Sequence, residues 1–209
     1  MLGFDELERD ALIEIFNVGA GHAAASMSML VGEPVRMSVP ALSFMARTEA
    51  AGALDQRNPD GGRICGISQF YDGAFKSEAI LMFPEARSLE IVRLMVGDLL
   101  PLAELTELEQ EALCEIGNII LNSCVGTLAD LFGQQLHGSQ PVYRIGRSDE
   151  ILHAGGGQAD TLVLMLHIDF FLERQRIHGY VAFILDVSGL HDLHGQVRRY
   201  LQRVLGEQA

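Results

Sequence analysis

The sequence predicts an internally duplicated fold of the α/β (α+β) class, in which two repeats of about 1–100 and 102–209 form one pseudo-two-fold domain over 1–209. The first observation is a repeated tetrad, because EIFN at 14–17 returns as EIGN at 115–118, 101 positions later. The second is that each tetrad lies on a long apolar helical pattern, followed by strand and hairpin patterns and a closing helix. Two such units predict a mixed sheet layer built from both halves, with the two long helices packed on it and their polar faces exposed.

The first half begins with a helix of about 27 residues, because Asp5 and Glu8 have the spacing of a capping box and the apolar pattern ends at Gly32. Residues 35–39 alternate as a half-buried strand, and Pro40 is expected to end it because proline has no N–H to donate. The composition of 46–62 predicts a loop. Strands over 64–71 and 75–83 flank a hairpin turn, and a helix over 85–96 follows.

The second half repeats this order. Thr106 and Glu109 form a second capping-box pattern, which predicts a helix that runs to Gly133. A strand over 142–145 and a loop over 146–160 come next, and the glycine run 155–157 in that loop lacks the Lys-Ser/Thr that would mark a phosphate loop. Strands over 161–171 and 178–186 and a closing helix over 190–205 complete the half.

The bulk composition favours a globular cytoplasmic protein. Its 28 acidic and 15 basic residues give a net charge of −13, which argues against nucleic acid or an anionic membrane surface as partner. The amino terminus lacks the pattern of a secretory signal, and the most apolar stretch, 162–172, is too short to span a bilayer, so no membrane insertion is expected. The three cysteines have no metal-like spacing, and His191 and His194 lack a further ligand nearby, so we expect reduced thiols, capping or solvent-facing histidines and no metal site.

The repeated Glu and Asn pairs are the candidate functional residues. On a helical wheel Glu14 and Asn17 lie opposite the apolar stripe, as do Glu115 and Asn118 in the second helix. Such a pair is most often an ordinary solvated feature, but its return in both halves favours a function. An amide is neither acid nor base and can hold a water molecule, which suggests catalysis by positioning on an activated phosphoryl group, with the carboxylate docking a basic residue of the substrate protein. Four neighbours on the same faces are predicted to contact that partner: Asp10, Gly21, Glu111 and Asn122.

The two Glu-Ile-x-Asn helices, the proline downstream of each and the duplicated layout over essentially the whole chain resemble the CheC/CheX/FliY phosphatases of bacterial chemotaxis, and CheC most closely. The motif of that family is an acidic residue or serine, a Glu, an Asn and a distant Pro. The first half matches it with Asp10, Glu14, Asn17 and Pro40. The second half matches it with Glu115, Asn118 and Pro141, but has Glu111 where Asp or Ser is usual.

The resemblance implies dephosphorylation of the phospho-aspartate of the response regulator CheY, with Mg²⁺ carried by CheY and no cofactor of the chain's own. It implies that Asn17 and Asn118 orient the attacking water and that Glu14 and Glu115 bind a lysine of the regulator. The deamidase CheD is an implied further partner. We expect alanine at both asparagines to abolish turnover without unfolding, because both amides are expected to face outward, and we expect the first site to be the weaker one.

Two other interpretations remain open. The chain could be a non-catalytic adaptor of the chemotaxis or flagellar switch system that uses the same faces only to bind. It could also be a ligand-sensing module gated by the glycine-rich loops, which ranks last because the sequence offers no convergent polar pocket.

Overall fold

The computed structural model of the chain describes residues 3–57, 62–73, 75–96, 102–156, 162–172, 175–185 and 187–206. The first half contains α1 (Glu6–Val31), β1 (Val35–Ala46), α2 (Arg47–Arg57), β2 (Ile64–Gly73), β3 (Ser77–Pro84), the 3-10 turn η1 (Glu85–Arg87) and α3 (Ser88–Val96). The second half contains α4 (Leu102–Phe132), β4 (Leu136–Gly138), β5 (Val142–Gly146), α5 (Ser148–His153), β6 (Leu162–Leu172), β7 (Gln175–Leu185) and α6 (Val187–Gly206).

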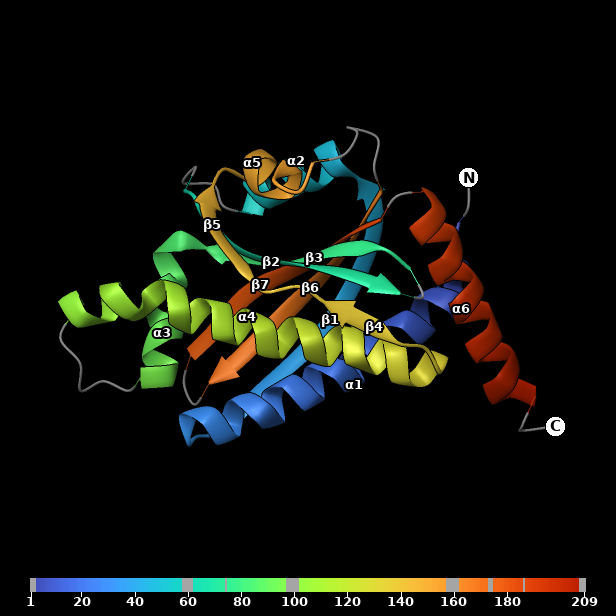
Figure 1. Cartoon of the computed structure of the whole chain (residues 1–209), viewed down its shortest axis with the longest axis horizontal. Coiled ribbons are helices and arrows are strands. Elements are labelled where there is room, and N and C mark those ends of the chain that lie inside the picture. The colour runs from blue at the N-terminus through green and yellow to red at the C-terminus, as the bar shows by residue number, and fades with distance from the viewer. Residues whose placement is uncertain are drawn as a thin grey trace.

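One seven-stranded sheet joins the two halves, as predicted (Figure 1). Its strand order is β1-β6-β7-β3-β2-β4, with β5 also paired to β2, and the pairings among the described strands are antiparallel. The hairpin of each half lies beside the first strand of the other half. Exchanging the two halves therefore gives the same strand order read from the opposite edge of the sheet. This is the pseudo-two-fold arrangement expected from the repeat.

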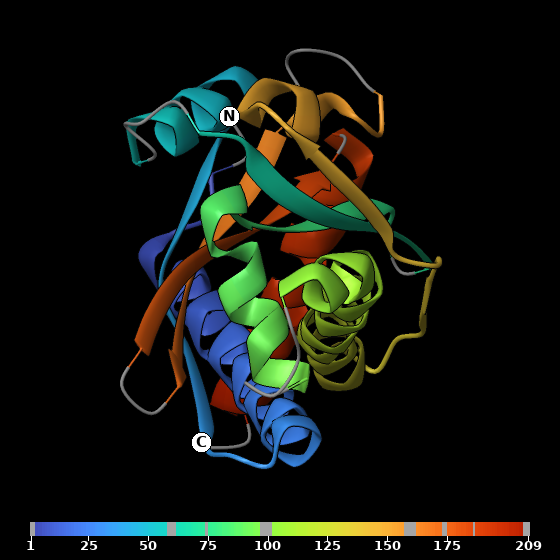
Figure 2. The same ribbon diagram turned by 90° about the vertical axis from the view of Figure 1, so that its left-hand side faces the viewer.

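Helices cover both faces of the sheet (Figure 2). The long helices α1 and α4 lie on one face with α3, and the apolar side chains between them and the sheet form the main core. A smaller core lies on the other face, under α2 and α5. The two long helices approach closely at Gly19, where a Cβ atom would lie 2.9 Å from the Cα of Cys124. The predicted packing of both long helices on one sheet is thus confirmed.

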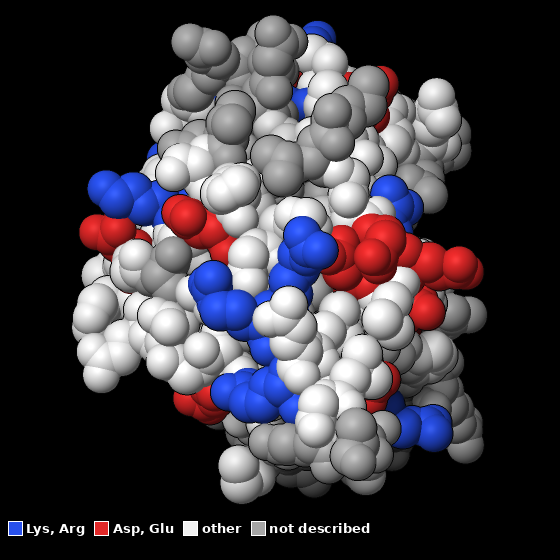
Figure 3. Space-filling model, turned by 90° about the vertical axis from the view of Figure 1, so that its right-hand side faces the viewer, with Lys and Arg blue, Asp and Glu red and all other residues white. Residues whose placement is uncertain are grey.

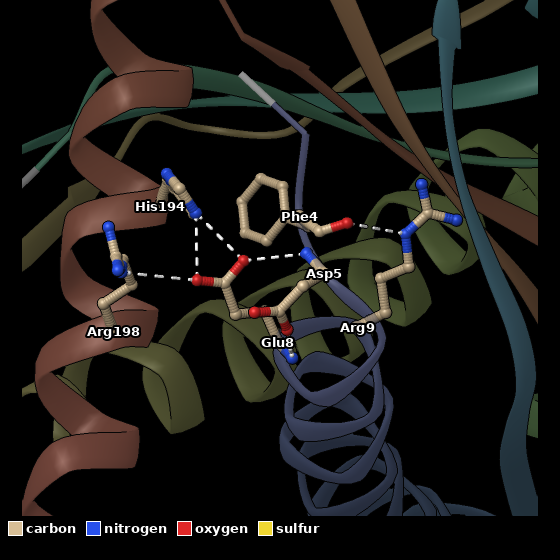
Figure 4. A network of polar contacts seen from close by, with 6 residues as sticks. All are labelled: Phe4, Asp5, Glu8, Arg9, His194 and Arg198. Atoms are coloured by element: carbon tan, nitrogen blue, oxygen red, sulfur yellow. Dashed lines mark hydrogen bonds and ion pairs between the residues drawn. The ribbon is translucent and has the colours of Figure 1, made fainter. Parts of the chain in front are cut away.

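Helix α1 starts and ends as predicted. The Asp5 side chain accepts a hydrogen bond from the N–H of Glu8, the Glu8 carboxylate accepts one from the N–H of Asp5, and Gly32 ends the helix with φ 73°. The Glu8 carboxylate, at 6% exposure, also lies 2.9 Å from Nε2 of His194 and 3.6 Å from Nε of Arg198, both on α6 (Figure 4). The expectation of a capping or solvent-facing role for His194 is therefore wrong, because its imidazole holds α6 against the start of α1.

Helix α6 carries a concentration of positive charge on this acidic protein. Its side chains Arg198, Arg199 and Arg203 are exposed. Figure 3 shows basic side chains along the middle of the face on which α6 lies, with acidic side chains beside them.

Several predicted boundaries are wrong. β1 continues through Pro40 because the pairing register with β6 shifts between Ser38 and Ala41, so this edge strand accommodates a residue without an N–H. Residues 46–62 and 146–160 were expected to be loops but contain α2 and α5. α4 begins at Leu102, so Thr106 lies inside the helix and does not cap it. Strand β4 was not predicted, and residues 58–61 of the expected loop fall outside the described residues.

Helix α4 contains a segment, Leu108–Phe132, that is long and apolar enough to cross a membrane by length and composition alone. Within the protein, 61% of its most apolar window is buried. The buried side chains include Leu113, Ile116, Ile120 and Leu128, which belong to the main core. Packing against α1 and the sheet thus accounts for the apolar composition of α4, as in the core helix of a soluble domain.

Candidate functional site

The amide of Asn17 is bonded to the backbone of β1. Its Nδ2 donates to the carbonyl oxygens of Ile13 at 3.0 Å and Val39 at 3.2 Å, and its Oδ1 accepts from the N–H of Val39 at 2.8 Å. Val39 precedes Pro40 at the register shift, where β1 does not pair with β6. Asn17 therefore supplies the hydrogen bonds that a neighbouring strand would otherwise make to Val39. Pro40, the proline downstream of the first tetrad, is the next residue in the chain.

The amide of Asn118 belongs to a ring of four polar side chains. Its Oδ1 accepts from Nε2 of Gln69 at 3.1 Å and from Nδ2 of Asn122 at 2.7 Å. The hydroxyl of Tyr71 closes the ring, lying 3.0 Å from Oε1 of Gln69 and 2.9 Å from Oδ1 of Asn122, with one proton to donate to either. Among the described residues, no hydrogen bond is recorded for Nδ2 of Asn118, so both of its N–H groups remain available.

The ring also links Asn118 to the segment before the second proline. Nε2 of Gln69 donates to the carbonyl oxygen of Ser139 at 2.9 Å, two residues before Pro141. The two asparagines therefore contact equivalent segments, but Asn17 does so directly and Asn118 through Gln69. Both amides are part-buried, so the expectation that they face outward like ordinary solvated residues is wrong.

The predicted carboxylates lie on the surface. Glu14 and Glu115 are exposed, and their side chains make no hydrogen bond or ion pair with the described residues. Three of the predicted partner contacts, Asp10, Gly21 and Glu111, are also exposed. The fourth, Asn122, is exposed as well, but its side chain is a member of the ring that holds Asn118.

The two sites lie at opposite edges of the sheet. Asn17 binds β1, which is one end of the strand order, and Asn118 lies at the other end, beside β2 and the segment between β4 and β5. The side chains that complete the sites therefore come from different strands.

The residue directly before the Asn differs between the two sites, being Phe16 in the first and Gly117 in the second. Phe16 is fully buried and its ring packs 5.3 Å from that of Phe183. At Gly117 a Cβ atom would lie 2.8 Å from the Cβ of Ile67, so β2 packs directly on the helix backbone there. Both positions point inward, as expected, and the difference is taken up by packing.

Known proteins share this fold and sequence. No family model matches the chain. The CheY-P phosphatase CheC of Bacillus subtilis is 28% identical over 160 residues, which cover 73% of each chain. The crystal structure of Thermotoga maritima FliY matches with a TM-score of 0.76 and 18% identity, covering 96% of this chain and 100% of that one. The CheX of a CheX–CheY–BeF3–Mg²⁺ complex from Borrelia burgdorferi matches with a TM-score of 0.51 and 18% identity, covering 83% and 97%.

The chain resembles the CheC/CheX/FliY family in sequence and in fold. It is most like CheC. The acidic and Asn residues of the motif lie on α1 and α4, as predicted, whereas Pro40 lies in β1 and Pro141 lies just before β5. Two residues of the second site were missed, Gln69 and Tyr71, which are buried at 1% and 4% exposure. They belong to β2 of the first half, so no pattern around the second tetrad could have found them.

A cleft of about 580 Å³ lies next to the second site of this CheC-like chain. Its wall includes Tyr71, Ser139, Arg47, Glu78 and Gly156. Burial raises the pKa of the Glu78 carboxyl and lowers the pKa of the Arg47 guanidinium, whose Nη1 donates to the carbonyl oxygen of Gly156. The sequence did not predict this cleft, whose wall combines polar and apolar side chains.

Proposed function

We propose that the chain is an aspartyl-phosphate phosphatase, a hydrolase that removes the phosphoryl group from a CheY-type response regulator. The likeness to the CheY-P phosphatase CheC and to the CheX solved with CheY supports this substrate class. The observation that carries the proposal is the preorganised Asn118 amide beside an unpaired Glu115 carboxylate, one helical turn apart on α4.

In the proposed reaction the chain supplies position and no covalent chemistry. Glu115 pairs with a lysine of the regulator and so fixes the docking register. The ring of Gln69, Tyr71 and Asn122 holds the Asn118 amide, whose free N–H groups contact the attacking water or a phosphoryl oxygen. The amide oxygen can accept a hydrogen bond from the water when the exposed Asn122 gives up its own hydrogen bond to that oxygen. Mg²⁺ is expected on the regulator, and the chain needs no cofactor of its own for this step.

The second site is proposed to be the more active one. Asn17 donates both of its N–H groups to backbone carbonyls, so it must break from Val39 before it can hold a water molecule. Asn118 needs no such change. A contribution from Glu14 and Asn17 at the first edge, binding of CheD and a cytoplasmic location also belong to the proposal, supported by the family resemblance.

The test is the lifetime of the phosphorylated regulator of the same organism, measured by phosphate release with catalytic amounts of this protein. We expect Asn118→Ala to lower the rate constant by about 10²-fold if misplaced water is the cause. Asp130→Ala, on the same helix but three turns further along, is the matched control and should keep the full rate.

The outcomes separate the enzyme from the adaptor. Shortening of the lifetime by the wild type, and its loss in Asn118→Ala with regulator binding retained, supports the phosphatase. A wild type that binds the phosphorylated regulator and leaves its lifetime unchanged contradicts the proposal and favours the non-catalytic adaptor. Equal losses in Asn17→Ala and Asn118→Ala, with both variants folded, would contradict the ranking of the two sites.

A further inference from the structure

A compact group of two histidines and one aspartate lies on the hairpin of β6 and β7. Nδ1 of His178 is 2.6 Å from Oδ1 of Asp169, and Nε2 of His167 is 3.5 Å from the same oxygen. The three candidate ligand atoms lie within 4.8 Å of one another. The group is separate from both asparagine sites, because neither α1 nor α4 contributes to it.

The strand geometry explains why these three side chains meet. His167 and Asp169 are two positions apart on β6 and so point to the same face of the sheet. Asp169 is directly opposite His178 in the pairing of β6 with β7, and His167 is opposite Tyr180. That face is the one that carries Met165 and Tyr180, opposite to the face covered by the long helices.

The surroundings order two of the three side chains. The carboxylate of Asp169 is 5% exposed, and the ring of Tyr180 stacks on that of His167 at 5.1 Å with an interplanar angle of 18°. His178, in contrast, is 51% exposed and can rotate. Two ligands are thus held in place by their surroundings, while the third is held only by its contact with Asp169 and lies where an ion can reach it.

We propose that His167, Asp169 and His178 form a binding site for a divalent transition metal of the Zn²⁺ class. Neutral imidazole nitrogens and a carboxylate oxygen are the ligands that such ions prefer, and three protein ligands leave a coordination position for water. Ligand atoms about 2.1 Å from a common ion stand at most about 4.2 Å apart, so a small rotation of His178 brings the present geometry into range. The ion would replace the direct 2.6 Å contact between His178 and Asp169.

This site goes beyond the phosphatase function and does not depend on it. Asp169 is opposite Ser38 on β1, and the next residue, Val39, is the one bound by Asn17. The proposed ion therefore lies across the sheet from the first asparagine site. The sequence pattern hid this group, because its ligands converge only through the pairing of β6 with β7.

The test is a calorimetric titration of the tag-free, metal-stripped protein with Zn²⁺, with Mg²⁺ as the comparison ion. We expect one Zn²⁺ per chain and no comparable Mg²⁺ binding. His178→Gln should lower the Zn²⁺ affinity by more than about 10-fold, since even outer-shell partners of metal ligands contribute about 10- to 100-fold. His191→Gln, an exposed histidine on α6, is the matched control and should bind as the wild type does.

A second variant and a second measurement keep the proposal testable if one variant fails to fold. Asp169→Asn should also lose affinity, and if this buried change prevents folding, the exposed His178 still decides the question. Binding of Co²⁺ should give a visible absorption band that disappears in His178→Gln. No Zn²⁺ binding by the wild type would overturn the proposal, and so would wild-type affinity in His178→Gln, which would place any bound ion elsewhere.

Discussion

Replacing Asn17 by alanine should destabilise the fold, and replacing Asn118 should do so far less. The amide of Asn17 is the hydrogen-bond partner of both backbone groups of Val39, a residue that is 1% exposed. Alanine would leave the N–H and the C=O of Val39 without a partner at the register shift of β1. The sequence analysis expects neither alanine variant to unfold, and the structure adds a difference in stability between them.

The structure sets the size of that difference. Each buried polar group left unpaired costs about 1–3 kcal/mol, so the two groups of Val39 together cost about 2–6 kcal/mol. The better helix propensity of alanine returns about 0.5 kcal/mol. In Asn118→Ala, Gln69 keeps its hydrogen bond to Ser139 and Asn122 is exposed to water, so the loss is about 1 kcal/mol.

The assay is urea unfolding followed by far-UV circular dichroism, because the chain has no tryptophan to report by fluorescence. The free energy of unfolding is compared for the wild type and the two variants. Thermal unfolding provides a check, since each kcal/mol shifts the Tm by about 2–4 °C in a chain of this size. If Asn17→Ala and Asn118→Ala unfold at the same urea concentration, the assignment of Asn17 as the partner of Val39 is refuted.

Three further changes test other parts of the structure. Gly117→Ala should lower the free energy of unfolding by about 1–3 kcal/mol, because its Cβ would meet Ile67. Gly126→Ala on the same helix is the control: it faces open space and should be neutral or stabilising. Equal urea midpoints for the two variants would contradict the packing. Tyr71→Phe should cost about 1–3 kcal/mol and slow phosphate release at the second site, because Gln69 loses its hydroxyl partner; an unchanged Tm and rate would speak against the ring. Glu78→Gln should raise the Tm at pH 7 and leave it unchanged at pH 4. Folding raises the pKa of Glu78, so ionisation of this carboxyl above its ordinary pKa destabilises the fold, and glutamine cannot ionise. A lower Tm at pH 7 would refute this.

The elements that the sequence predicted well are those with a strong local pattern. The two long helices and the two hairpins have apolar periodicity over many residues and clear turn or capping residues. The elements that it missed are short and depend on tertiary packing. α2 buries Ala50, Ala51 and Leu54 on the smaller core, and α5 buries Ile151 and Leu152 there, but each segment is flanked by glycines that favour a loop when no partner is in view.

The candidate site was predictable in its members and not in its hydrogen bonds. Exposure of Glu14 and Glu115 follows from the helical wheel, which needs only local positions. The bonds of the asparagines do not, since Asn17 reaches a residue 22 positions away and Asn118 one 49 positions away. Those partners depend on strand pairing and on the register shift at Pro40, which a single sequence does not reveal.

The difference between the two amides follows from the side chains that each edge of the sheet supplies. Gln69 and Tyr71 of β2 and Asn122 of α4 hold Asn118 by side-chain hydrogen bonds. At the other edge β6 offers the apolar Ile168 and Phe170, and the helix position that corresponds to Asn122 is Gly21. Neither of these apolar side chains can hydrogen-bond Asn17, and its amide pairs with the backbone of β1. The same Asn in two copies of one motif thus keeps its N–H groups available at one edge and uses them to bond the backbone at the other, because the strands beside the two copies carry different side chains.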